Sequence, residues 1–206
     1  MGRVCGAAGL LLLVVAAPVF GQANPNSLSA AEKADGWTLL WDGKSTAGWE
    51  TAVNSQMEIS EGAMRQARGA FVWLRHSTTF ADFVLRFEFR MLTEDADSGL
   101  FIRAAKDGDP TRTGYQININ NMNQEYGTGS VVNRVKYSDS KVKTAQWYQY
   151  EITAEGEHIV VVLDGRKTVD FRDGAARQGY IGFQLVKPLE VEFRNIRLKK
   201  LQRTGQ

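Results

Sequence analysis

The stretch that decides the fold is Phe83-Val-Leu-Arg-Phe-Glu-Phe-Arg90. Its side chains alternate between apolar and polar, and successive side chains of a β-strand point to opposite faces of a sheet. The apolar positions that share one face are Phe83, Leu85, Phe87 and Phe89. The other face carries Arg86, Glu88 and Arg90. The stretch therefore predicts a β-strand whose aromatic face lies in a hydrophobic core.

The same period of two continues along the chain, and Gly, Asp and Asn separate the segments at intervals of about ten residues. Asp164-Gly165 is a hairpin signal, because a type I′ turn needs positive φ at both central residues. The other segments that we expect to form strands are 99–105, 115–120, 148–153, 158–163, 169–171, 179–185 and 191–198. Many alternating strands with little helix predict an all-β sandwich of two antiparallel sheets.

Length and charge narrow the class of protein. The chain has 206 residues, of which 43% are hydrophobic and 23% are charged. This length is enough for one two-layer core and short for two, so we expect one folded domain. The formal net charge is +2, which gives no electrostatic case for a nucleic-acid partner. The sequence does not indicate the oligomeric state.

The first residues have the pattern of a secretory signal peptide. Arg3 precedes an apolar run at 10–17, and small residues follow up to Ala23. The run is shorter than the ~20 residues that a membrane-spanning helix needs, which makes a retained anchor the weaker alternative. Cys5, the single cysteine, precedes the run and would be removed with it. We expect a secreted or periplasmic protein that has no disulfides and no membrane contact after cleavage.

These patterns divide the chain into four parts. Residues 1–23 are the expected signal peptide. Residues 24–35 are small and polar, which indicates a linker or a loosely docked arm. The alternating pattern begins at Gly36, so the folded domain is expected at 36–201, followed by a C-terminal tail at 202–206.

A row of neutral amides lies on the predicted strand at 115–120. Gln116 and Asn118 share one face of this strand. Because an amide both donates and accepts hydrogen bonds, such a row suits sugar hydroxyls, although a solvated outer face is the alternative. We count Gln116, Asn118, Tyr115 and Gln184 as candidate substrate-binding residues.

The segment 97–103 places Asp97, Gly99 and Arg103 on one side if its strand is continuous. The Arg103 guanidinium supplies a fixed fork of donors, Asp97 supplies a carboxylate, and Gly99 leaves space above the backbone. Together they predict a polar pocket floor in which Arg103 binds substrate. The alternative is a salt bridge between Asp97 and Arg103.

Aromatic and metal-binding signals are weaker. Trp73 is the tryptophan that we place nearest a cleft, where its ring would stack on the apolar side of a sugar. His76 and His158 are far apart and have no metal-ligand spacing, and no phosphate-binding or dinucleotide fingerprint is present. We expect no cofactor and no transition metal, while a calcium ion held by oxygen ligands stays open.

An ordered set of motifs resembles the 3-keto-disaccharide hydrolase domain family. The motifs lie at 36–44, 48–49, 80–90, 97–103, 114–116, 147, 150–156, 163–165, 179–184 and 191–197. The similarity covers residues 36–201. It implies a concanavalin A-like jelly-roll sandwich, a carbohydrate partner, and an activity that cleaves glycosides whose sugar carries a ketone at C3.

The chemistry implied by this resemblance has a physical logic. A ketone at C3 acidifies the C2 proton, so a general base can remove it, and elimination then expels the substituent at C1. An amide or guanidinium at the ketone oxygen would stabilise the enolate. We expect the substrate-binding groups to be Arg103, Gln116, Asn118 and Gln184.

The chain departs from the family pattern at three places. Where the family has Asn-Ser-Gly, Gly-Tyr-Glu and Gln-x-His, this chain has Asp97-Ser-Gly99, Gly114-Tyr-Gln116 and Gln184-Leu-Val186. An amide is no base near neutral pH, so catalysis would need another carboxylate, such as Asp97 or Glu88. Two alternatives stay open beside the hydrolase or lyase: a non-catalytic carbohydrate-binding module of the same fold, and a structural sandwich whose polar row is solvated.

Overall fold

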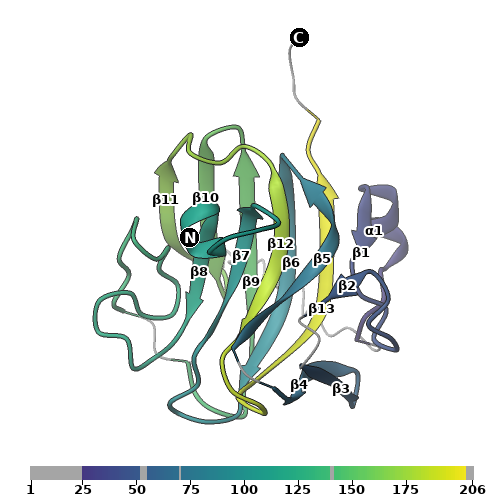
Figure 1. Ribbon diagram of the computed structural model, residues 1–206. Helices are drawn as coiled ribbons and strands as arrows, with labels where there is room; N and C mark the ends of the chain where they lie inside the picture. Colours follow the sequence, from purple (N-terminus) through teal and green to yellow (C-terminus); the bar gives the residue numbers. More distant parts are fainter. Residues whose placement is uncertain (1–24, 52–54, 70, 140–141, 203–206) are drawn as a thin grey trace, which may run out of the picture.

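The computed structural model describes residues 25–51, 55–69, 71–139 and 142–202, and the predicted signal peptide lies outside them. In this part of the chain two antiparallel sheets form a jelly-roll sandwich, with two short helices beside them (Figure 1). The fold class predicted from the alternating pattern is confirmed. No helix among the described residues is long and apolar enough to cross a membrane.

The larger sheet has eight strands in the order β11-β10-β9-β6-β13-β4-β3, with β1 paired to β13 beside this path. The strands are β1 (Trp37–Leu39), β3 (Gln56–Ser60), β4 (Ala63–Arg68), β6 (Phe83–Met91), β9 (Trp147–Glu155), β10 (His158–Leu163), β11 (Arg166–Arg172) and β13 (Val191–Lys200). The strand predicted at 83–90 is β6, which lies between β9 and β13 with its predicted aromatic face fully buried.

The smaller sheet has five strands in the order β2-β5-β12-β7-β8. They are β2 (Trp49–Glu50), β5 (Val72–Phe80), β7 (Ser98–Ala104), β8 (Tyr115–Ile119) and β12 (Gly179–Leu185). Helix α2 (Pro110–Thr113) lies between β7 and β8 in the chain and packs against both strands. This sheet carries the candidate site on its outer face.

The two sheets meet in an aromatic core. Phe183 of β12 stacks on Phe193 of β13 with 4.1 Å between ring centroids, and Phe87 of β6 meets Phe183 edge-on at 5.2 Å. All three side chains are fully buried. Burial of one such side chain contributes about 1.5–3 kcal/mol, so these rings are a main attachment between the sheets.

The turns and bulges are set by residues with positive φ. Asp164 and Gly165 join β10 to β11 with φ values of +46° and +77°, which confirms the predicted hairpin. Arg103 has a φ of +52° and lies where the pairing of β7 with β12 shifts register. Simple alternation predicts one face of the sheet for the Arg103 side chain. A bulge of this kind turns the side chain to the other face.

Arg103 is consequently turned away from the outer face, where the sequence analysis placed it. Its guanidinium pairs with Asp82 at 3.0 Å, and no part of its side chain is exposed. The same group donates to backbone carbonyls of Ala81, Gly156 and Ala176. Arg103 therefore closes one end of the sandwich by joining three loops, and its ion-pair partner is Asp82 rather than Asp97.

The segment before the domain is docked by specific hydrogen bonds, more firmly than the expected linker or loosely docked arm. Helix α1 (Ala30–Ala34) begins at a capping box formed by Ser29 and Glu32. Glu32 also forms an ion pair with Arg197 of β13 at 2.5 Å. Helix α1 lies beside β1 at the margin of the larger sheet (Figure 1).

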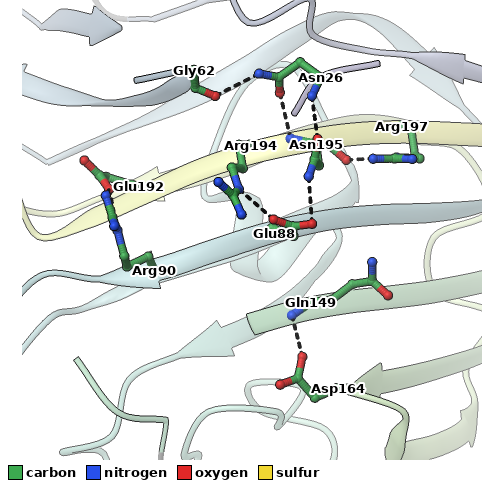
Figure 2. Close-up of polar contacts among 10 residues, drawn as sticks. All are labelled: Asn26, Gly62, Glu88, Arg90, Gln149, Asp164, Glu192, Arg194, Asn195 and Arg197. Atoms are coloured by element: carbon green, nitrogen blue, oxygen red, sulfur yellow. Dashed lines mark hydrogen bonds and ion pairs between the residues drawn. The ribbon is translucent and has the colours of Figure 1, made fainter. Parts of the chain in front are cut away.

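Asn26 and Asn195 form a reciprocal clasp that holds this segment. The Asn26 backbone N–H donates to Asn195 Oδ1 at 2.5 Å, and the Asn195 N–H donates to Asn26 Oδ1 at 2.8 Å (Figure 2). Asn26 Nδ2 also donates to the carbonyl of Gly62 at 2.8 Å. Both asparagines have positive φ, which Asn tolerates better than most residues.

We predict that Asn26→Gly lowers the free energy of unfolding by about 2 kcal/mol, because the buried Asn195 N–H loses its acceptor while the backbone of residue 26 keeps its positive φ without strain. Chemical denaturation of the mature chain measures this change. Ser29→Ala is the control, since the cap of the exposed helix α1 is worth roughly 1 kcal/mol. Equal effects of the two substitutions would show that the clasp does not hold the segment.

Asp82→Ala is expected to destabilise the protein by roughly 3–5 kcal/mol, because it leaves the buried Arg103 guanidinium without its countercharge. Thermal denaturation would show the loss. Asp95→Ala removes an exposed carboxylate that lies 3.6 Å from Lys187, and an exposed pair of this kind contributes at most about 1 kcal/mol. A small effect of Asp82→Ala would contradict the structural role of Arg103.

Candidate functional site

Three amides gather on the outer face of the smaller sheet. Gln116 Nε2 donates to Gln184 Oε1 at 2.6 Å and lies 3.4 Å from Asn118 Oδ1. A Cβ at Gly99 would lie 3.1 Å from Gln116 Nε2 and 2.9 Å from the carbonyl of Ile117. Gly99 therefore leaves the space in which the Gln116 side chain crosses β7 to reach β12. We call Gln116, Asn118 and Gln184 the amide cluster.

The amide cluster is covered rather than solvated. Thr111 of α2 donates its hydroxyl to Gln116 Oε1 at 2.9 Å, and Asn118 Nδ2 donates to the carbonyl of Tyr126. The three amide residues are only 2–9% exposed. The row is thus neither the open pocket floor nor the solvated face considered from the sequence, and it forms a neutral polar layer beneath α2 and the following loop.

A groove of about 520 Å³ opens beside this cluster. Its lining comes from β2, β5 and the turn before α2, and consists of Glu50, Thr51, Phe71, Val72, Trp73, Arg75, Gly108, Asp109 and Pro110. Trp73 is the cross-strand neighbour of Gln184 and joins the groove to the cluster. The volume lies within the ~300–1,000 Å³ range of small-molecule sites.

The Trp73 ring is fixed in one orientation. It packs edge-to-face on Phe101 with 5.8 Å between centroids. A Cβ at Gly182 would lie 2.6 Å from Trp73 Cε3, so only glycine at that position lets the indole lie close to β12. A rigid aromatic face at the wall of a groove is suited to stacking against an apolar ring face.

Arg75 lies at the groove with its guanidinium held on several sides. Its NH1 group donates to the carbonyl of Lys106 at 3.0 Å, and its NH2 group forms an ion pair with Glu50. The guanidinium lies 5.4 Å from the centroid of Trp73 and 4.6 Å from that of Tyr180. Among the described residues, Arg75 Nε has no hydrogen-bond partner. These contacts hold the Arg75 guanidinium in one position, and not all of its N–H groups are used in hydrogen bonds.

Two carboxylates line the same groove. The hydrogen bond and charge of Arg75 hold the pKa of the Glu50 carboxyl below its usual range, so Glu50 is ionised at neutral pH. The Glu50 side chain is 55% exposed and accessible from the groove. Asp109 caps α2, where its Oδ1 accepts the Thr111 N–H at 2.9 Å and its Oδ2 lies 3.5 Å from Arg112. Glu50 is therefore the carboxylate with the freer approach to a ligand.

Asp97, the replacement base expected from the sequence, lies outside this groove. It lines a separate cavity of about 10 Å³ together with Gln184, Val186 and Glu190. A cavity of that size holds at most one water molecule. The structure brings Asp97 close to one member of the amide cluster and gives it no space for a sugar.

Glu88, the other expected base, lies on the opposite sheet. It projects from the outer face of β6, where it accepts from Arg194 Nε at 2.6 Å and Asn195 Nδ2 at 2.7 Å (Figure 2). The second bond holds the Asn195 amide, whose Oδ1 accepts the Asn26 N–H. Its neighbours make Glu88 part of the clasp that docks the N-terminal segment, on the far side of the sandwich from the amide cluster.

Tyr115 also differs from its expected place. Its ring belongs to the buried core, and its hydroxyl donates to the carbonyl of Asp173 at 3.0 Å. Burial raises the pKa of this phenol.

Within the described part of the chain, no three side chains of His, Cys, Asp or Glu gather as a metal-binding group. The groove offers an organic ligand an aromatic ring, a guanidinium and carboxylates.

The sequence analysis missed Arg75 and Glu50. Alternation puts Trp73 and Arg75 on one face of β5, and this signal was present in the sequence. Nothing local to Glu50 indicates its role, because it reaches the groove through the pairing of β2 with β5, where it lies opposite Arg75.

Solved structures with the same fold support the architecture. A proposed glycosyl hydrolase from Parabacteroides distasonis matches with a TM-score of 0.77 and 17% identity, covering 87% of this chain and 100% of that one. The carbohydrate-binding module CBM66 from Bacillus subtilis matches with a TM-score of 0.59 and 20% identity, covering 74% and 96%. At these identities the likeness shows the fold alone.

Sequence comparison places the chain more narrowly. No curated protein matches the sequence. A family model described as the 3-keto-alpha-glucoside-1,2-lyase-like domain matches residues 36–199, which is most of the chain and agrees with the resemblance found in the ordered motifs. The chain belongs to the family of 3-keto-α-glucoside-1,2-lyase-like domains, known equally as 3-keto-disaccharide hydrolase domains.

Proposed function

We propose that this chain is an exported glycoside-processing protein that binds a 3-keto-glycoside in the groove and cleaves it by elimination. The observation that carries the proposal is the convergence of Trp73, Arg75 and Glu50 on one open space of about 520 Å³. Membership of the family supports a 3-keto sugar as the ligand. Export rests on the N-terminal pattern alone.

In this proposal the groove recognises the sugar by two kinds of contact. The indole of Trp73 stacks on the apolar face of the ring, as aromatic side chains stack on other ring faces. The guanidinium of Arg75 donates to the ketone oxygen at C3. A fixed cation at that oxygen stabilises the negative charge that develops when the C2 proton leaves.

The same arrangement supplies the base. C2 and C3 are adjacent atoms, so the base and the group that binds the ketone must also be adjacent. Glu50 and Arg75 form a direct ion pair, and the Glu50 carboxylate is ionised and half-exposed. Glu50 takes the C2 proton as Arg75 stabilises the enolate, and the electron pair then expels the substituent at C1.

Asp97 has a weaker geometric claim to this step than Glu50. Its cavity of about 10 Å³ is too small for a sugar ring, and Asp97 does not line the groove. We therefore assign proton abstraction to Glu50 and keep Asp97→Asn as the variant that tests the alternative base.

A non-catalytic sugar-binding module is the second candidate. The observation in its favour is the neutral amide cluster, in which Gln116 stands where the family pattern has a glutamate and donates to Gln184. Val186 likewise stands where the pattern has a histidine. In this alternative the groove binds a sugar through Trp73 and Arg75 without turnover. Binding without product release would favour it.

The first prediction for the groove concerns turnover. The mature chain is expected to release product from a 3-keto-glucoside and not from the unoxidised glucoside, because only the ketone acidifies C2. Glu50→Gln should lower kcat by roughly 10²–10⁴-fold, the usual contribution of a general base. Because Arg75 lowers the pKa of Glu50, the wild-type rate should persist at acidic pH until that carboxyl is protonated, below the ordinary glutamate range.

Two variants complete this experiment. Glu157→Gln is the matched control, since Glu157 is an exposed glutamate that pairs with Arg177 at the other end of the molecule. It should leave kcat unchanged. Loss of turnover in Asp97→Asn with full activity in Glu50→Gln would transfer the base to Asp97.

The second prediction concerns binding. Trp73→Ala should weaken the affinity for the glucoside by roughly tenfold, because a rigid aromatic contact in a binding site contributes on the order of 1–2 kcal/mol. Isothermal titration calorimetry measures the change. Trp147→Ala is the control, because Trp147 lies on the outer face of the larger sheet between Arg90 and Arg194. Equal losses in both variants would point to general destabilisation.

A further inference from the structure

The groove has a polar end and an apolar end. Phe71 precedes β5, and Phe71, Trp73 and Arg75 project from the same side of the chain because side chains alternate along a strand. The distance from Arg75 to Phe71 along the strand is about 13 Å, at ~3.3 Å per residue. The charged pair of Glu50 and Arg75 lies at one end of this line, and Phe71 lies at the other.

Phe71 is unusual in its exposure. Its side chain is 57% exposed, and the other exposed large apolar residues in the described part of the chain are Met122 and Leu189, which do not line the groove. The described lining of the groove also includes the apolar side chains of Val72 and Pro110, together with Thr51, Gly108 and Asp109. An aromatic ring left in water beside other apolar groups has a surface that a ligand can cover favourably.

We infer that the groove is built for glycosides with an apolar, aromatic leaving group, that is, for 3-keto aryl glycosides. The inference rests on the proposed function and adds the class of substituent at C1. With the sugar stacked on Trp73 and its C3 ketone at Arg75, the substituent at C1 would extend toward Phe71. A second sugar there would bury hydroxyls against Phe71, Val72 and Pro110, none of which has a side-chain group that forms hydrogen bonds.

The chemistry of elimination favours the same class. The Glu50 carboxylate takes the C2 proton, the C–H electron pair forms the enolate, the C1–O bond breaks, and the products are a C1=C2 enone and the departing oxyanion. An alkoxide needs a proton donor in order to leave readily. The side chains of Phe71, Val72 and Pro110 donate no proton, and a phenol, with a pKa of about 10, leaves as its anion and takes its proton from water.

The test measures recognition and cleavage separately. Calorimetry with phenyl and methyl glucosides of the same anomeric form, neither of which carries a ketone, reports recognition of the substituent. We expect the phenyl glucoside to bind roughly tenfold more tightly in the mature wild-type chain, and Phe71→Ala to reduce that ratio by roughly fivefold without changing the affinity for the methyl glucoside. Met122→Ala, which removes an exposed apolar side chain outside the groove, should keep the ratio.

The 3-keto forms of the same two glucosides then report cleavage. Faster release of phenol than of methanol, with the phenyl preference reduced in Phe71→Ala, supports the inference. Cleavage of both 3-keto substrates with equal affinities for the phenyl and methyl glucosides overturns it and leaves the proposed function standing. A phenyl preference that depends on Phe71, without cleavage, supports the apolar subsite and removes the catalytic proposal. Failure of both glucosides to bind, with neither 3-keto form cleaved, overturns both.

Discussion

The contact between Phe183 and Phe193 is the constraint on which the outer face depends. These rings stack across the sandwich at 4.1 Å, and Phe87 packs against Phe183 from the middle of the larger sheet. Once Phe183 points inward, the period of two on β12 forces Gly182 and Gln184 outward. The aromatic core therefore sets the register in which Gln184 meets Gly99 and Trp73.

Glycines on the outer face turn this register into a site. A side chain at Gly99 would fill the space that Gln116 uses to reach Gln184, and one at Gly182 would displace the indole of Trp73. A sheet covered evenly by side chains has no depression. Here the two missing side chains leave room for Gln116 and Trp73, and the groove is lined by residues of β2, β5 and the turn before α2.

The alternating pattern predicted the strands that are long and contain a continuous apolar face, such as β6 and β10. The Asp-Gly pair predicted the hairpin at Asp164. Trp73 was placed near a cleft as an aromatic residue, and it lines the groove. The alternating pattern placed Arg103 on the wrong face, because a bulge breaks alternation and no simple pattern announces the positive φ of an arginine. Asp97 and Glu88 were chosen by residue type. The small cavity beside Asp97 and the ion pair of Glu88 with Arg194 depend on tertiary contacts that local sequence does not encode.

The pairing of Glu50 with Arg75 explains how a neutral amide cluster and a charged site can coexist on one sheet. A carboxylate among Gln116, Asn118 and Gln184 would be 2–9% exposed and without a cation, which is unfavourable. At the edge formed by β2 and β5, a carboxylate is half-exposed and has a guanidinium beside it. Charged groups are thus stable where the groove is open, at the edge strand β2 and its neighbour β5. The neutral amides lie nearer the centre of the sheet, where Gln184 is the cross-strand neighbour of Trp73.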